Sequence, residues 1–119
     1  MAVPGFAPAV TYSVTGVGVS PSIKIISPVY SGMRAGGFVQ PALGIAIIGT
    51  VTTNVQWSGD DYTAPGYSDA TANWFPFTNM QGLSAAASAT IGAAMTMVRL
   101  NNQGGTSGTA TISVCQLGN

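Results

Sequence analysis

Residues 45–57 read Ile-Ala-Ile-Ile-Gly-Thr-Val-Thr-Thr-Asn-Val-Gln-Trp, and this stretch decides the fold class of the chain. From position 50 the side chains alternate, with Val51, Thr53, Val55 and Trp57 on one side and Thr50, Thr52, Asn54 and Gln56 on the other. Because successive side chains of a β-strand point to opposite faces, this period of two predicts a half-buried strand. A strand over 45–57 would be about 40 Å long and could cross a sandwich with a bend at Gly49.

The rest of the chain has the composition of a β protein. Val and Ile together number 19 against four Leu, with 13 Thr and 23 Gly and Pro residues. An excess of β-branched residues with frequent breakers is typical of many short strands. We expect strands at 10–19 and 22–27, loops at 31–41 and 58–71, a short aromatic segment at 73–77, an extended segment at 83–94, and a terminal hairpin of 95–100 and 109–117 around the Gly-rich turn 101–108.

These segments predict an all-β, antiparallel β-sandwich of about seven short strands, either jelly-roll or Ig-like. We expect a single β-sandwich domain at 10–119, preceded by a flexible N-terminal arm at 1–9 that becomes ordered on contact with neighbours. The longest apolar run, Leu43 to Ile48, is too short to cross a bilayer, so no membrane partner is expected.

The chain is unusually poor in charge. Its charged residues make up 5% of the sequence, three cations against three acids, where a soluble domain has about 25%. Three dispersed cations cannot line a phosphate-tracking groove, so nucleic acid is not expected as a partner. A neutral surface favours association, and we therefore expect copies of the chain or a scaffold to cover much of it.

Most residue types that enzymes use are missing. The chain has no His, which excludes imidazole bases and His-ligated metals, and its single Cys115 cannot form an intrachain disulfide. Without a neighbouring base, Cys115 is interpreted as a small packing residue rather than a nucleophile. One unpaired Cys fits synthesis in a reducing compartment. We expect no enzymatic activity and no cofactor.

All three acids, Asp60, Asp61 and Asp69, fall within ten residues of one loop. Their carboxylates, together with loop carbonyls, could hold a Ca²⁺ ion, although the spacing matches no EF-hand. We expect turn chemistry instead, because Asp caps and Asx-turns are common in such loops, and we therefore predict no metal site. An acid of this loop could also pair with Arg34 or Arg99.

Six of the ten aromatic residues lie between positions 57 and 77. We expect Trp57 and one of Trp74 and Phe75 to fill the sandwich interior, and the other rings to form a subunit interface. Exposed rings could instead stack on sugars. The candidate interface residues are Trp57, Tyr62, Tyr67, Trp74, Phe75, Arg34 and Arg99.

Several stretches resemble a family of small β-rich virion proteins of tailed bacteriophages. They are Gly49-Thr-Val-Thr-Thr-Asn-Val-Gln-Trp-Ser-Gly-Asp-Asp61, Trp74-Phe75, Gly82-Leu-Ser-Ala-Ala-Ala-Ser-Ala89, Val98-Arg-Leu-Asn101 and Gly108-Thr-Ala-Thr-Ile-Ser-Val-Cys-Gln116. The resemblance covers about residues 45–117, and the first 44 residues match no family pattern.

This resemblance implies a structural component of the particle, a capsid decoration or cement protein on the capsid exterior, assembled in the host cytoplasm. Its partners would be the major capsid protein and further copies of the chain, as a trimer or dimer. A tail or fibre-attachment part is the alternative within the same class. A carbohydrate-binding or host-adhesion module is the alternative from a different class.

Overall fold

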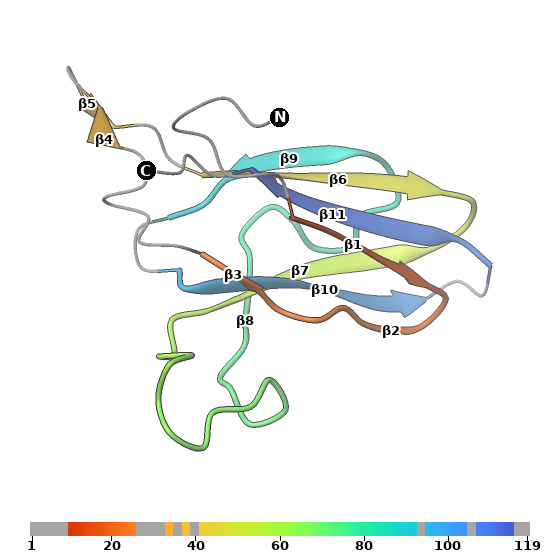
Figure 1. The fold of residues 1–119 in the computed structure, drawn as a ribbon. Helices are drawn as coiled ribbons and strands as arrows, with labels where there is room; N and C mark the ends of the chain where they lie inside the picture. Colours follow the sequence, from red (N-terminus) through yellow and green to blue (C-terminus); the bar gives the residue numbers. More distant parts are fainter. Residues whose placement is uncertain are drawn as a thin grey trace.

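The computed structural model describes residues 10–25, 33–34, 37–38, 41–92, 95–104 and 107–115. Over these residues the chain forms two antiparallel sheets that face each other as a sandwich (Figure 1), which confirms the predicted all-β class. Within the same ranges, no helix is long and apolar enough to cross a membrane. The expected arm at 1–9 lies outside the described residues.

One layer is a four-stranded sheet in the order β1-β11-β6-β9. Every neighbouring pair is antiparallel. Its members are β1 (Val10–Thr15), β6 (Ala42–Ile48), β9 (Ala87–Thr90) and β11 (Thr109–Cys115). β11 lies between β1 and β6, and pairs with β6 along its full length and with β1 from Thr109 to Val114.

The other layer is a five-stranded sheet in the order β2-β10-β7-β8, with β3 also paired to β10. Its members are β2 (Gly18–Val19), β3 (Ile23–Lys24), β7 (Thr52–Ser58), β8 (Phe75–Pro76) and β10 (Met97–Gly104). A separate ladder of β4 (Met33–Arg34) and β5 (Gly37–Phe38) falls within the segment expected to be a loop.

The stretch 45–57 is not one strand. It breaks at Gly49, whose φ of 78° turns the chain from β6 in one sheet to β7 in the other. The predicted bend is therefore a crossing between layers rather than a curve within a strand. The alternation is confirmed, since Val51, Thr53 and Val55 are buried.

Two further expectations fail for the same reason. The expected strand 10–19 ends at Thr15 and continues from Gly18 as β2 in the other sheet, with positive φ at Gly16 in the break and at Gly18. The expected terminal hairpin does not form, because β10 pairs with β7 while β11 pairs with β1 and β6. Gly-rich connections thus carry the chain across the sandwich at three places.

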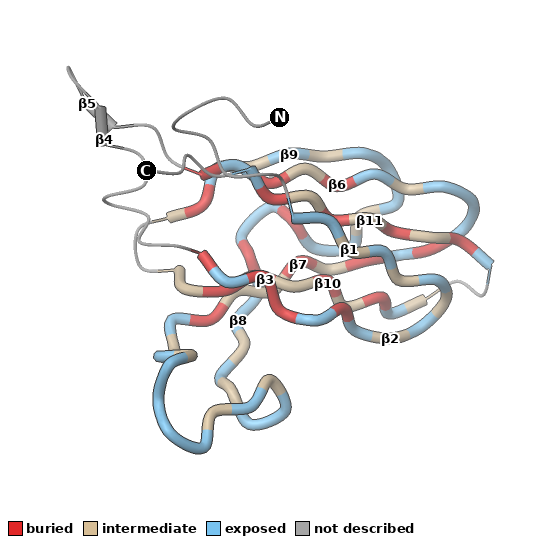
Figure 2. Tube along the Cα trace, viewed as in Figure 1, coloured by how far each residue is buried: buried red, intermediate tan, exposed pale blue. Residues whose placement is uncertain are grey.

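Buried residues occur on strands of both sheets (Figure 2), and their side chains, mostly aliphatic, form one core cluster. The core comprises Ile23, Ile25, Leu43, Ile45, Val51, Val55, Phe77, Met80, Ile91, Val98, Leu100, Ala110, Ile112 and Val114. Trp57 packs against this cluster while only partly buried. The expectation that Trp74 or Phe75 joins it is wrong, since Phe75 is 46% exposed and Trp74 packs on the outside of a sheet.

A buried asparagine ties the two sheets together. Asn102 of β10 is fully buried, and its Nδ2 donates to Val14 O (2.9 Å) and Gly16 O (2.8 Å) where β1 ends. At the same end of the molecule, Gly108 N donates to Thr50 O (3.0 Å). A Cβ on Gly108 would lie 2.5 Å from the carbonyl carbon of Thr50, so only glycine fits this crossing.

Candidate functional site

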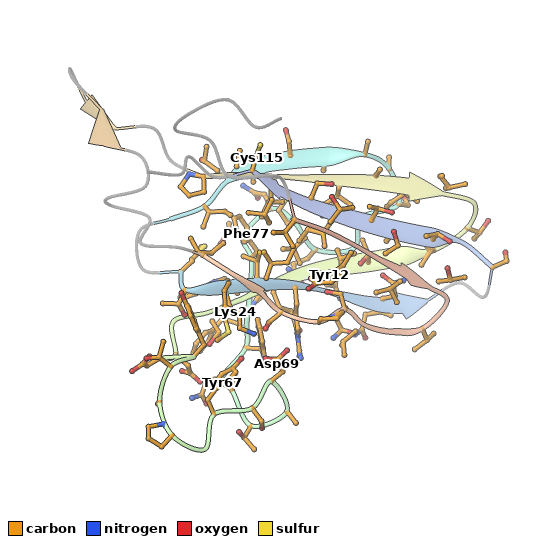
Figure 3. The ribbon with its side chains drawn as sticks, viewed as in Figure 1. Tyr12, Lys24, Tyr67, Asp69, Phe77 and Cys115 are labelled. Atoms are coloured by element: carbon orange, nitrogen blue, oxygen red, sulfur yellow. The ribbon has the colours of Figure 1, made fainter. Side chains whose placement is uncertain are left out.

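The loop 58–74 lies against the outer face of the five-stranded sheet. Tyr67 Oη contacts Met97 Sδ (2.8 Å), and the Trp74 ring lies 4.2 Å from the Arg99 guanidinium carbon. Because Val98 and Leu100 point into the core, Met97 and Arg99 face outward under this loop. Figure 3 shows Tyr67 and Asp69 on this side of the molecule, near Lys24 and far from Cys115.

Asp69 is the acceptor that holds the loop in place. Its carboxylate accepts hydrogen bonds from Ser22 N (3.0 Å), Ser22 Oγ (2.9 Å) and the Tyr67 hydroxyl. Lys24 Nζ donates to Ser22 Oγ (2.8 Å), and the Trp74 indole donates to Asp69 O (3.0 Å). The structure therefore gives Asp69 a structural task, fastening the loop to the chain just before β3.

The ionisation of this cluster follows from those contacts. Burial alone would raise the pKa of Asp69, but hydrogen bonds from Tyr67 and Ser22, with the charge of Lys24, outweigh it and lower the pKa. Burial and the hydrogen bond to Asp69 raise the pKa of Tyr67. Partial burial lowers the pKa of Arg99, an effect that Asp69 opposes. Asp69 is thus fixed as a carboxylate at neutral pH.

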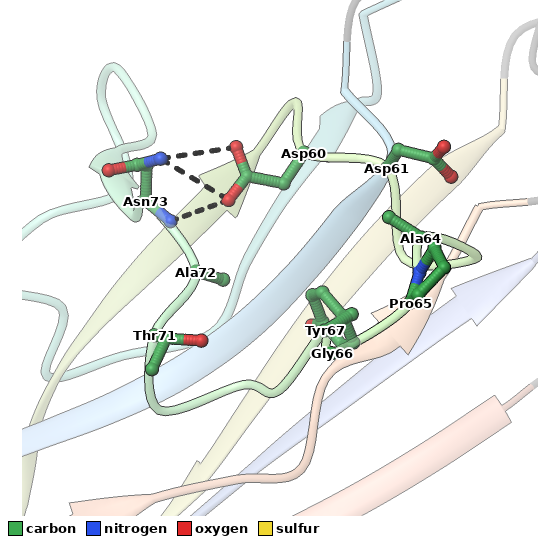
Figure 4. Close-up of a pocket in the computed structure, with 9 residues that line it drawn as sticks. All are labelled: Asp60, Asp61, Ala64, Pro65, Gly66, Tyr67, Thr71, Ala72 and Asn73. Carbon is green, nitrogen blue, oxygen red and sulfur yellow. Dashed lines mark hydrogen bonds between the residues drawn. The ribbon is translucent and has the colours of Figure 1, made fainter.

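The other two acids have separate local partners. Asp60 accepts from Asn73 N (2.8 Å), and Asp61 accepts from Thr63 N (2.9 Å) and Thr63 Oγ1 (2.5 Å). These hydrogen bonds lower the pKa of Asp61. Figure 4 shows the carboxylates of Asp60 and Asp61 pointing away from each other. Both residues, with Tyr67, line a depression of about 320 Å³.

The three acids do not come together as the candidate calcium site would require. In the described ranges, no three His, Cys, Asp or Glu side chains are grouped so that they could hold a metal ion. The carboxylates act instead as loop acceptors, which is the turn-chemistry alternative. Arg99 is held by Gln56 Oε1 (2.8 Å) and the Trp74 ring, with Asp69 close enough to attract it. The side chain of Arg34 lies outside the described residues.

The predicted interface aromatics mostly serve the fold of the loop. The Tyr62 hydroxyl donates to Ile25 O (3.3 Å), and the Trp57 and Phe75 rings pack 5.1 Å apart between centroids. Trp74 has one ring face on Arg99. Phe75 is the one described aromatic side chain of this set that is widely exposed. An interface made by these residues stays a prediction.

Sequence reasoning missed a surface on the opposite side of the molecule. The outward positions of the four-stranded sheet are those between its buried residues, because side chains alternate along each strand. We call them the neutral face: Thr11, Ser13, Thr15, Ala42, Gly44, Ala46, Ile48, Ser88, Thr90, Thr109, Thr111, Ser113 and Cys115. It contains no charged residue, and every side chain except Ile48 is small.

Hydroxyl groups run across this face in rows. Thr11 and Ser113, Ser13 and Thr111, and Thr15 and Thr109 pair Oγ to Oγ across β1 and β11, at 3.1, 2.8 and 2.8 Å. Cys115 continues the outward series and is exposed, so its interpretation as a packing residue is wrong. All described charged side chains, Lys24, Asp60, Asp61, Asp69 and Arg99, lie on the side of the five-stranded sheet.

Comparison with known proteins gives no match, so the interpretation of the site rests on the geometry described above. No protein-family model, no curated protein and no solved structure matches the chain. The described residues therefore offer two surfaces: a loop whose acids and rings are engaged in its own packing, and a neutral face whose side chains are directed to solvent.

Proposed function

We propose that this chain is a structural protein of a tailed-bacteriophage virion, a decoration or cement protein that binds the outside of the capsid and stabilises contacts between major capsid subunits. The neutral face is the observation that carries the proposal. It supports a docking role because covering an uncharged surface costs less hydration free energy than covering a charged one, provided that its hydroxyls keep hydrogen-bond partners. The resemblance of residues 45–117 to virion proteins of tailed bacteriophages is the reason for proposing a phage capsid as the docking partner.

The chemistry of the face sets the kind of contact. Each Thr or Ser hydroxyl can donate or accept a hydrogen bond, so the rows Thr11–Ser113, Ser13–Thr111 and Thr15–Thr109 can match backbone groups of a partner. Ile48, 75% exposed at the end of β6, supplies apolar area. Since no ion pair is available on this face, attachment should change little with salt.

The test is binding of the purified chain to particles that lack it, measured by co-sedimentation. Ala46→Lys puts a charge in the middle of β6 on the neutral face, and Ala64→Lys makes the same change in the exposed loop. We expect Ala46→Lys to reduce particle binding at least tenfold and Ala64→Lys to leave it unchanged. Equal effects, or a steep loss of the unsubstituted protein between about 0.05 and 0.3 M salt, would contradict the proposal.

Position on the particle is separated by the same assay. Purified capsid shells without tails should bind the chain, whereas isolated tails should not. Binding to tails alone would favour the tail or fibre-attachment alternative. The carbohydrate-binding alternative receives less support from the loop, because Trp74 is stacked on Arg99 and donates to Asp69 O.

A further inference from the structure

The sandwich has four strand edges in its described residues, and they differ in how well they are protected. In the five-stranded sheet, the edge strand β8 contains Pro76, and the opposite edge is divided into two-residue strands with Lys24 on one of them. Proline and lysine are common means of blocking edge pairing. The four-stranded sheet ends in β9, of four residues, and β1, of six.

β1 is the longest edge strand and the least protected. Its sequence Val-Thr-Tyr-Ser-Val-Thr has no charge and no proline, and it is typical of a strand that pairs readily. In the sheet order, β1 has β11 on one side and no described strand on the other. An edge of this kind is a template for another strand.

The register shows which backbone groups are available. Gly16 N donates to Gly108 O, and hydrogen-bonded pairs recur at every second residue of an antiparallel ladder. Val10, Tyr12 and Val14 therefore bond to β11, while the N–H and C=O groups of Thr11, Ser13 and Thr15 point to the open side. These are also the residues whose hydroxyls pair across to β11.

This pattern is symmetric about Ser13. If a second copy of β1 runs antiparallel alongside the first, Ser13 lies opposite Ser13, and Thr11 opposite Thr15 at both ends. All three open residues then form hydrogen-bonded pairs, giving about six backbone hydrogen bonds. The two neutral faces join into one continuous sheet face, and their hydroxyl rows continue across the junction.

Exposed apolar side chains gather at the same edge. Val10 at the start of β1, Val17 in the turn that follows it and Val19 in β2 are 37, 70 and 51% exposed. In the antiparallel register, Val10 of each copy lies opposite Gly16 of the other, next to its Val17. Covering these side chains removes apolar surface from water at both ends of the junction.

We infer that two copies of this chain associate through their β1 edges, antiparallel and centred on Ser13. A second copy fits this edge better than an unrelated strand does, because one six-residue segment supplies both partners with matching register, hydroxyl rows and no repelling charge. As a step in virion assembly this contact rests on the proposed function, but as a contact it is measured without particles.

Amide hydrogen exchange of the full chain tests the register directly. The amides of Thr11, Ser13 and Thr15 should exchange at least tenfold more slowly at high protein concentration than at low concentration, in step with dimerisation seen by sedimentation. Those of Tyr12 and Val14 should stay protected throughout. Protection of Thr11, Ser13 and Thr15 at every dilution would show that the chain covers its own edge and would overturn the inference.

Proline variants identify the edge. Ser13→Pro removes an N–H that points to the open side, so the monomer should keep its fold, confirmed by thermal unfolding, and lose the dimer. Ser88→Pro makes the same change at an outward amide of β9 and should leave the dimer intact. A chain that sediments as a monomer at high concentration, or a dimer lost with Ser88→Pro and kept with Ser13→Pro, would refute the inference.

Particle binding of the same proteins keeps the two proposals apart. Ala46→Lys should remain a dimer while losing particle binding, because Ala46 is on the face and not on the edge. If the unsubstituted chain dimerises but does not bind particles, the proposed function is refuted and the β1 contact is still supported. Chains that stay monomeric and still bind particles would overturn the β1 contact and leave the proposed function supported.

Discussion

Replacing Asn102 tests how the two sheets are held together. Asn102→Ala removes two hydrogen bonds, from Nδ2 to Val14 O and to Gly16 O, each contributing about 1 kcal/mol net. It also leaves the Val14 and Gly16 carbonyls without this donor and a space where a fully buried side chain stood. Removing Oδ1, which has no hydrogen-bond partner among the described residues, offsets about 1 kcal/mol of this loss. The net loss is about 2 kcal/mol, a sizeable share of the ~5–15 kcal/mol that stabilises a typical domain.

The assay is the free energy of unfolding from urea titration. Thr53 provides the matched control: it lies opposite Asn102 in β7, is fully buried, and its Oγ1 has no hydrogen-bond partner among the described residues. Thr53→Val removes that hydroxyl at constant shape and should be neutral or stabilise by about 1 kcal/mol. A loss below about 1 kcal/mol for Asn102→Ala would refute the role assigned to Asn102.

Three further predictions follow from local contacts. Gly108→Ala should cost about 3 kcal/mol or more in urea unfolding, because its Cβ would lie 2.5 Å from the Thr50 carbonyl carbon, whereas Gly44→Ala, with open space around it, should cost little; equal costs would contradict the close approach. Because the pKa of Asp69 is lowered in the fold, ionised Asp69 stabilises the protein at pH values above its usual pKa of 3.8, and this stability is lost as pH falls through the folded pKa. Asp69→Asn should therefore have a lower Tm at neutral pH and a smaller drop in Tm between about pH 5 and pH 2.5. The same drop in Tm as in the unsubstituted protein would contradict this. Cys115 should be alkylated readily in the free protein and protected on particles, and equal alkylation in both states would place docking elsewhere.

The sequence pattern predicts the strands better than their partners. Period-two alternation locates β7 and its inward residues, because that signal lies within one strand. Whether a Gly-rich turn folds a chain back on itself or carries it to the other layer depends on contacts with distant strands. The turn after β10 has the composition of a hairpin turn, yet Gly108 meets Thr50 and β11 enters the other sheet.

The candidate site shows the same limit. The sequence predicts Trp57 and one of Trp74 and Phe75 in the core, on the general tendency of large rings to be buried, but Trp74 packs on Arg99 outside the sheet. Tyr67, predicted at an interface, contacts Met97 and anchors the loop there. Cys115 could have been placed outward by continuing the alternation of Ala110, Ile112 and Val114. The neutral face could not be recognised from sequence, because its four strands are scattered along the chain and become neighbours only when sheet order is known.

Every described charged side chain lies on the side of the five-stranded sheet, and the neutral face lies on the opposite side. The two sides of the molecule are therefore chemically different, and a copy bound through one side exposes the other. The loop 58–74, which contains Ala64, Pro65 and Gly66, projects from the five-stranded sheet on the side away from the four-stranded sheet (Figure 1). A short peptide inserted there would be carried outward by any copy that lies with its hydroxyl rows against a support. The fold is therefore suited to presenting foreign epitopes in a single, uniform orientation.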